Sequence, residues 1–282
     1  MSDLAVAWPT MTPAERRHAY RARILGTDRN LFRRLLKRLG FEKGPVPPVP
    51  QRVARRALVL AAVVARAEID QPASRDQDPE SIRMGLRNLV SKIGIQREFE
   101  NRELTLLNTP VGRVNAELAI AAAWRAEGLA VLAWALNWFR LPAYDQPLSR
   151  SEIAASAGLR NREQCNQLLK SPTLRSPVEI DQIAARATVV TWRLRTFRMS
   201  PIPWDFVGHL RRQPAFQEHW ITGLELIDND LAIDGRPIYD AAEEAVARVE
   251  RIAIERQIAA YWLQGDHVRY SQVDPSTLLS TC

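Results

Sequence analysis

The chain has 282 residues, of which 46% are hydrophobic and 25% charged, which suits one large globular domain or two small ones. Its two cysteines, Cys165 and Cys282, exclude a disulfide framework and a cysteine-based zinc site, and they fit a reducing compartment. The formal net charge of +7 is uneven, because residues 1–66 hold 14 Lys/Arg and 4 Asp/Glu and the remainder holds 25 and 28.

The basic start of the chain predicts a face for nucleic acid, lipid headgroups or an acidic partner. The alternative is that it packs against the acidic end, since the residues from Glu225 onward hold 5 Lys/Arg and 11 Asp/Glu. The first residues lack a basic start followed by an apolar core. No secretory signal is therefore expected, and the chain is predicted to be cytoplasmic.

Composition divides the chain into three predicted segments. These are a basic N-terminal helical extension (1–44), a proline-rich spacer (45–51) and a helical core domain (52–282). The extension includes an amphipathic helix with a possible partner-binding basic side, which consists of Arg33, Arg34, Lys37 and Arg38. Such a helix can lie on a membrane or bind nucleic acid, or its charges can be a solvated face over a core.

Hydrophobic periodicity predicts an all-α fold: a single large irregular helical domain around a buried central helix at about 113–140. The predicted helices of the core domain are 52–68, 79–95, 98–107, 113–140, 178–199 and 241–263. The segment 206–226 is expected to be helical in parts. The segment 228–237 is expected to be a loop, with Asp234-Gly235 as a turn signal.

The predicted central helix is almost wholly apolar and has no proline. At about 100° per residue, Glu127 points in the same direction as the three tryptophans of this helix, and Arg125 is rotated away. The tryptophans are Trp124, Trp134 and Trp138. A carboxylate on such a face needs a cationic partner or a raised pKa. The longest uncharged run, 128–139, is shorter than the about 20 residues that span a bilayer, so no transmembrane segment is expected.

The last predicted helix places Arg256 at the centre of its apolar arc. Because arginine keeps its charge, we predict that Arg256 pairs with Glu127 in the core. Glu255, Arg175 and Arg125 are expected nearby, as parts of one buried ionic network. The favoured interpretation is structural, and the alternative is an acid in an apolar pocket that is catalytic or binds a ligand.

The segment 149–170 resembles a helix-turn-helix, with Gly158 four residues after Ala154. Its second helix would offer base-reading side chains from Arg160, Asn161, Arg162, Gln164 and Gln167. The apolar residue expected six positions after the turn glycine is replaced by Gln164, which weakens this interpretation.

Several motifs occur in order along the chain. They are Trp124-Arg125-x-Glu127, Leu132-x-Trp134-Ala135-Leu136, Leu141-Pro142, Leu174-Arg175-Ser176 with Trp192, and Glu255-Arg256 with Ala260, Trp262 and Leu263. With the helix 55–67, they resemble the uncharacterised bacterial family Domain of Unknown Function 4272 over roughly 52–277. The resemblance implies no established activity, but it implies that Glu127, Arg175, Glu255 and Arg256 recur together as motif residues.

The chain departs from that family at two places. Thr188 and Val189 stand where the family tends to have Tyr-Arg, and Tyr270-Ser271-Gln272 stands where a Trp-Asp-Asp run is expected. An activity that needed those acids would be absent from this chain.

The sequence shows no glycine-rich phosphate loop and no G-x-S-x-G, and its four histidines lack metal-ligand spacing. No cofactor or metal is predicted, and an enzyme is not favoured. We expect a protein–protein interaction module, such as an accessory or immunity-type protein, whose partner is another protein. The alternatives are nucleic-acid binding through the basic N-terminal third and the segment 149–170, and an enzyme with an acidic site around Glu127 and Glu255. No oligomeric state is predicted.

Overall fold

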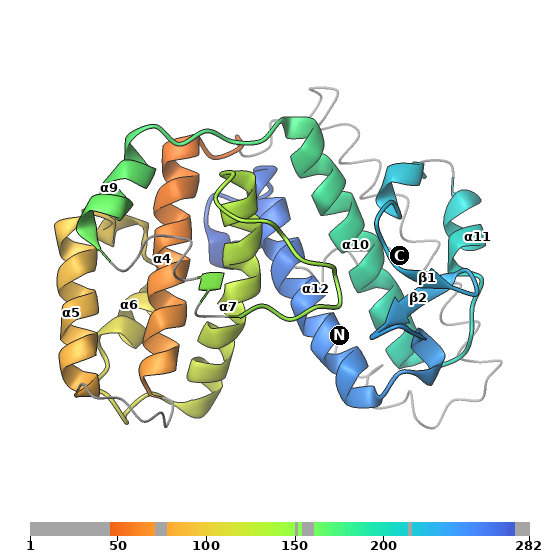
Figure 1. Cartoon of the computed structure of the whole chain (residues 1–282), viewed down its shortest axis with the longest axis horizontal. Coiled ribbons are helices and arrows are strands. Elements are labelled where there is room, and N and C mark those ends of the chain that lie inside the picture. Colours follow the sequence, from red (N-terminus) through yellow and green to blue (C-terminus); the bar gives the residue numbers. More distant parts are fainter. Residues whose placement is uncertain (1–45, 71–77, 150–151, 154–160, 214–215, 274–282) are drawn as a thin grey trace. The chain divides into compact units, whose positions relative to one another are not determined.

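The computed structural model of the chain describes residues 46–70, 78–149, 152–153, 161–213 and 216–273. Val46–Val273 forms one compact unit, which is mainly helical with one small sheet (Figure 1). The all-α fold class is thereby confirmed. The predicted extension 1–44, with its basic side at Arg33, Arg34, Lys37 and Arg38, lies outside the described residues.

Eight α-helices lie in the part of the chain that the structure describes. They are α4 (Pro50–Ile69), α5 (Pro79–Lys92), α6 (Asn101–Asn108), α7 (Ala116–Ala135), α9 (Arg162–Lys170), α10 (Pro177–Met199), α11 (Phe206–Arg211) and α12 (Glu243–Leu263). Short 3-10 turns are η2 (Gln96–Glu98), η3 (Glu218–Trp220), η4 (Ile238–Asp240) and η5 (Tyr270–Gln272). Pro50 and Gln51, which were assigned to the proline-rich spacer, belong to α4, because proline suits the first turn of a helix.

Helix α4 is buried over most of its length. Between Val53 and Val64 only Arg55 is exposed, and α4 packs against α5, α6, α7 and α9. Side chains that are aliphatic all round a helix favour burial on every side. The buried centre of the described unit thus includes α4 as well as the C-terminal half of α7.

Helix α7 is shorter at both ends than expected. Asn115 caps its start, and its side chain accepts a hydrogen bond from the backbone N–H of Glu117 at 2.8 Å. Its end is fixed by Asn137, whose φ of 63° is left-handed, and by the backbone N–H of Trp138, which donates to the Ala133 carbonyl at 2.8 Å. Trp138 therefore lies beyond the helix, and its predicted place on the Glu127 face is wrong.

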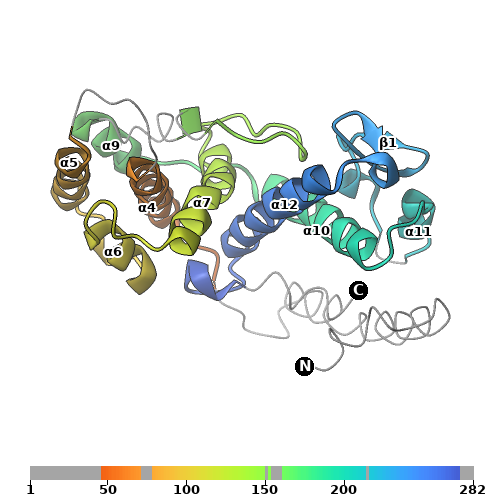
Figure 2. The same cartoon turned by 90° about the horizontal axis from the view of Figure 1, so that it is seen from below.

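Helix α7 contacts α4 and α12, and α12 contacts α10. Figures 1 and 2 show α4, α7, α12 and α10 following one another across the described unit in two perpendicular views. Each of these helices has 20 or more residues. The crossing of α7 with α12 positions the charged side chains described below.

The segment 228–237, expected to be a loop, forms most of a small antiparallel sheet. Its strands are β1 (Leu226–Ile227), β2 (Asp230–Ile233) and β3 (Arg236–Pro237), in the order β1-β2-β3. Two-residue turns at Asp228-Asn229 and Asp234-Gly235 have positive φ at all four residues. Asp, Asn and Gly tolerate this conformation, which matches the twist of tight hairpins. Asp234-Gly235 is therefore a turn as expected, but it joins two strands.

The described part of the chain contains one helix, α7, with the length and apolar composition of a membrane span. Core helices of globular proteins meet the same criteria. Within the protein, 61% of the most apolar 18-residue window of α7 is buried. The expected lack of a transmembrane segment stays a prediction.

Candidate functional site

Two ion pairs join α7 to α12 at their crossing. Arg256 Nε donates to Glu127 Oε2 at 2.9 Å, and Arg125 Nη1 donates to Glu255 Oε2 at 3.0 Å. Gly128 faces the α12 backbone, so Arg125 and Glu127 flank it and reach α12 on opposite sides. The contact between Glu127 and Arg256 expected from the sequence is present, and Arg125 and Glu255 lie beside it.

The Glu127–Arg256 pair holds the loop that follows α7. The guanidinium of Arg256 also donates to three backbone carbonyls of this loop, those of Pro142 (3.2 Å), Ala143 (2.8 Å) and Gln146 (3.2 Å). Glu127 Oε1 accepts from the backbone N–H of Leu148 at 3.3 Å. The polar groups of the pair are thus engaged by the protein itself.

Burial sets the electrostatics of this pair. The side chains of Glu127 and Arg256 are 4% and 6% exposed. Burial raises the pKa of the Glu127 carboxyl above its ordinary value, and the neighbouring Arg256 opposes this rise. The loop and α12 cover Glu127. Trp124 and Trp134, by contrast, are only half-buried.

Tyr270 of η5 closes the same crossing from the Arg125 side. Its ring lies under the guanidinium groups of Arg56 (4.9 Å) and Arg125 (5.6 Å) and contacts the ring of Trp262 (5.8 Å). Its hydroxyl is buried against Gly128 and has no hydrogen-bond partner among the described residues. Burial raises the pKa of this phenol, so it stays neutral. The position where the family's Trp-Asp-Asp run was expected is thus a packing contact.

Arg175 does not join this network. Its Nε donates to the Trp134 carbonyl at 2.9 Å, its backbone N–H donates to the Ala135 carbonyl at 2.8 Å, and its guanidinium lies 4.9 Å from the Trp134 ring centroid. It also pairs with Glu179 at 3.0 Å. Arg175 therefore binds the last carbonyls of α7, where a cation is favourable. The expectation that it lies in the network of Glu127 and Arg256 is wrong.

A second buried pair, between Arg193 of α10 and Asp230 of β2, was not predicted from the sequence. Nε and Nη2 of Arg193 donate to Oδ1 and Oδ2 of Asp230 at 2.6 and 2.5 Å, and both side chains are 1% exposed. Asp230 lay in a segment taken for a loop, where a carboxylate would be solvated. The two turn dipeptides, Asp228-Asn229 and Asp234-Gly235, are the signal that could have predicted a strand between them and so placed Asp230 in the core.

The described part of the segment 149–170 gives limited support to a helix-turn-helix. Residues 154–160 lie outside the described residues. Helix α9 exists and packs on α4. However, the Asn161 side chain accepts from the Gln164 backbone at 2.8 Å and donates to its side chain at 3.2 Å. Two of the expected base-reading residues are therefore used to cap α9.

Among the described residues, no group of three or more His, Cys, Asp or Glu side chains could hold a metal ion.

These features define a mainly helical protein in which two arginine–glutamate pairs, one of them buried on both sides, join α7 to α12. A scan against protein-family models matches residues 42–220 to the family described as Domain of unknown function (DUF4272), and the chain belongs to that family. The resemblance found in the sequence is confirmed, although the match ends earlier than expected, before Glu255 and Arg256. Neither the curated proteins nor the solved structures contain a match to this chain.

Proposed function

We propose that this protein is a helical protein–protein interaction module, and that its partner protein docks on the N-terminal half of α7. The observation that carries the proposal is the contrast between the two halves of this helix. From Leu129 to Ala133 the helix is completely buried, whereas Ile120 is 58% exposed. An accessory or immunity-type protein would work through a surface of this kind.

The N-terminal half of α7 carries several apolar side chains that are at least partly exposed. Around Ile120, Ala116 is exposed, and four further apolar side chains are half-buried: Leu118, Ala119, Ala121 and Trp124. Isolated exposed apolar side chains are ordinary, but a contiguous group that includes a tryptophan is typical of a binding surface.

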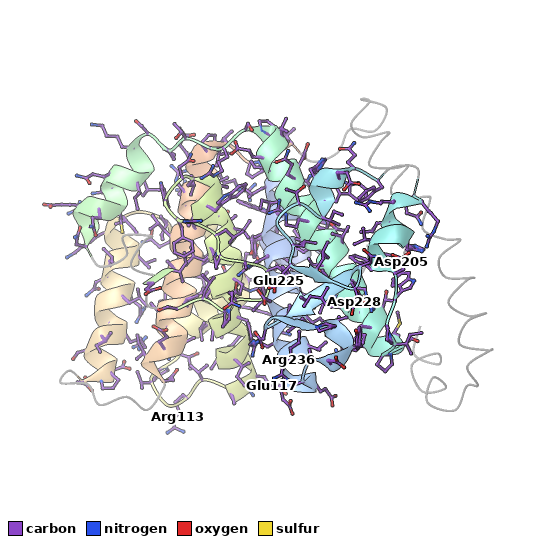
Figure 3. The ribbon with its side chains drawn as sticks, turned by 45° about the vertical axis from the view of Figure 1, so that its right-hand side comes forward. Arg113, Glu117, Asp205, Glu225, Asp228 and Arg236 are labelled. Atoms are coloured by element: carbon purple, nitrogen blue, oxygen red, sulfur yellow. The ribbon has the colours of Figure 1, made fainter. Side chains whose placement is uncertain are left out.

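Helix geometry indicates where this surface lies. Gly128 packs against α12, and Trp124 and Ala121 follow it along the same face, one and two turns towards the helix start. The face that packs on α12 thus continues beyond the contact. Arg113 and Glu117, labelled in Figure 3, are both exposed at the start of α7 and give this surface a polar rim.

The charged motif residues do not favour an enzyme over an interaction module. Glu127 and Glu255 each have an arginine partner from the facing helix, and Glu127 is covered by the loop after α7. A catalytic acid has to contact its substrate, which this arrangement does not favour. The ionic network supports a structural role, and the docking surface is separate from it.

The test is a photo-crosslinking amino acid placed at Ile120 of the full chain in its native host. Val178, an equally exposed valine at the start of α10, is the matched control position. We expect one protein to be crosslinked at Ile120 and not at Val178. Ile120→Glu should then weaken binding of that purified protein by at least about tenfold, because it puts a charge into a desolvated contact.

Three outcomes would contradict the proposal. The first is crosslinking that is equal at both positions. The second is an Ile120→Glu variant that binds the identified protein as tightly as the wild type. The third is a crosslink of the chain to itself alone, which would make the surface a contact between copies.

A further inference from the structure

A second surface of the described unit combines exposed valines with arginines at the start of α4. Val46, Val49 and Val268 are 84%, 59% and 61% exposed. Arg52 joins two of them: its backbone N–H donates to the Val49 carbonyl at 2.9 Å, and its Nη2 donates to the Val268 carbonyl at 2.6 Å. Residues distant in the sequence therefore meet at one place.

Three further arginines adjoin these residues in the sequence or along the helix. Arg55 follows Arg52 by one helical turn, Arg269 follows Val268, and Arg97 precedes Glu98, and all three arginines are exposed. We call this group the Arg52 surface; it consists of Val46, Val49, Arg52, Arg55, Arg97, Val268 and Arg269.

The carboxylates next to the Arg52 surface are engaged within the protein. Glu98 accepts from Arg52 Nε at 3.3 Å. Glu100 accepts from the backbone N–H of Ser271 at 3.2 Å and takes part in the capping box of α6. The charge that this surface presents outward is therefore mainly positive.

We propose that the Arg52 surface docks on an anionic lipid bilayer. Aliphatic side chains that project from a folded body enter the headgroup boundary, and arginines around them pair with anionic headgroups. The segment that directly precedes Val46 is also basic, since residues 1–45 hold 10 Lys/Arg and 4 Asp/Glu. Its charge is therefore of the sign that attracts anionic lipid, as is the charge of the Arg52 surface.

Nucleic acid fits this surface less well than lipid does. Recognition of single strands uses exposed aromatic side chains for stacking, and the aromatic residues next to the Arg52 surface, Trp262 and Tyr270, are buried. Valine side chains add nothing to the phosphate contacts that position a protein on a duplex. Insertion into a bilayer uses both the valines and the arginines.

The experiment is flotation of the full chain with vesicles of phosphatidylcholine alone or with about one third phosphatidylglycerol, at low and at physiological salt. We expect binding to the anionic vesicles only, weakened by salt. The double variant Val49→Glu/Val268→Glu should reduce this binding by about tenfold or more, because it removes apolar insertion and adds repulsion. Val178→Glu is the matched control and should bind as the wild type does.

Circular dichroism of each variant establishes that it is folded. The proposal is overturned if the full chain does not float with anionic vesicles, including the case in which it shifts duplex DNA instead. It is also overturned if Val49→Glu/Val268→Glu binds as the wild type does while neutralising Arg33, Arg34, Lys37 and Arg38 abolishes binding. That result would assign the lipid contact to the basic extension.

Discussion

At the scale of single residues, the fold depends on arginines that are buried together with their acceptors. Arg56, Arg66, Arg193 and Arg256 are each 5% exposed or less. Each donates to a carboxylate and also to at least one backbone carbonyl outside its own helix. Breaking such a pair leaves an uncompensated charge in the core, so these residues are expected to be sensitive to substitution.

Arg256→Met should lower the free energy of unfolding by about 3–5 kcal/mol at pH 7, because it leaves the buried Glu127 carboxylate without its cationic partner and three loop carbonyls without the Arg256 donor. Burial already raises the pKa of Glu127, and removing the arginine raises it further. A carboxyl with a raised folded-state pKa binds a proton more readily when folded, so its contribution to stability falls as the pH rises above its ordinary range.

The loss caused by Arg256→Met should therefore be smaller at about pH 5 than at pH 7, as measured by urea unfolding. The control is Glu127→Gln/Arg256→Met, in which this part of the pH dependence should disappear. An equal loss at both pH values, or no loss at all, would show that the two side chains do not depend on each other.

The Glu127–Arg256 pair could be predicted from the sequence because both residues lie within regular helices. There, an angle of about 100° per residue places each charge on an apolar arc. The pairing of Arg193 with Asp230 could not be predicted in this way. It depends on where a strand of four residues lies in space, and no local periodicity marks so short a strand.

At the scale of elements, long helices were predicted well and short or irregular elements poorly. Helices α4, α10 and α12 begin and end within a few residues of their predicted limits. The sheet was missed because its strands are two to four residues long. The end of α7 was misplaced because Asn137, without a proline or glycine, adopts the left-handed conformation that ends the helix.

The contact between α7 and η5 gives a prediction at this scale. A Cβ at position 128 would overlap the Tyr270 hydroxyl but would lie 3.5 Å from Cζ of that ring, which is ordinary contact. Gly128→Ala should therefore lower the free energy of unfolding by about 1–3 kcal/mol through overpacking. Tyr270→Phe should be close to neutral, because the hydroxyl that it removes has no partner among the described residues.

When Tyr270 is replaced by Phe, the effect of Gly128→Ala on the free energy of unfolding should change sign. The alanine should then stabilise the protein by up to about 1 kcal/mol, since alanine is a better helix former than glycine. Thermal or urea unfolding of the four proteins completes the cycle. Additive effects of the two substitutions would contradict the described packing of Tyr270 on Gly128.

At the scale of the whole molecule, the family match and the folded unit have different limits. The match ends at Trp220, whereas the compact unit continues to Val273. The later segment supplies the partners of Glu127, Arg125 and Arg193, together with the Tyr270 ring. The motif residues on α7 therefore specify a contact that is completed only by α12 and η5, and Arg193 of α10 finds its carboxylate partner only in β2.

The most direct test of this account compares urea unfolding of the full chain with that of a variant truncated after Trp220. We predict that the full chain unfolds in one cooperative transition. The truncated chain should show no cooperative transition, because it leaves Glu127, Arg125 and Arg193 without partners and uncovers the buried half of α7. A truncated chain that unfolds cooperatively, with a midpoint near that of the full chain, would contradict the claim that the α7–α12 crossing holds the fold together.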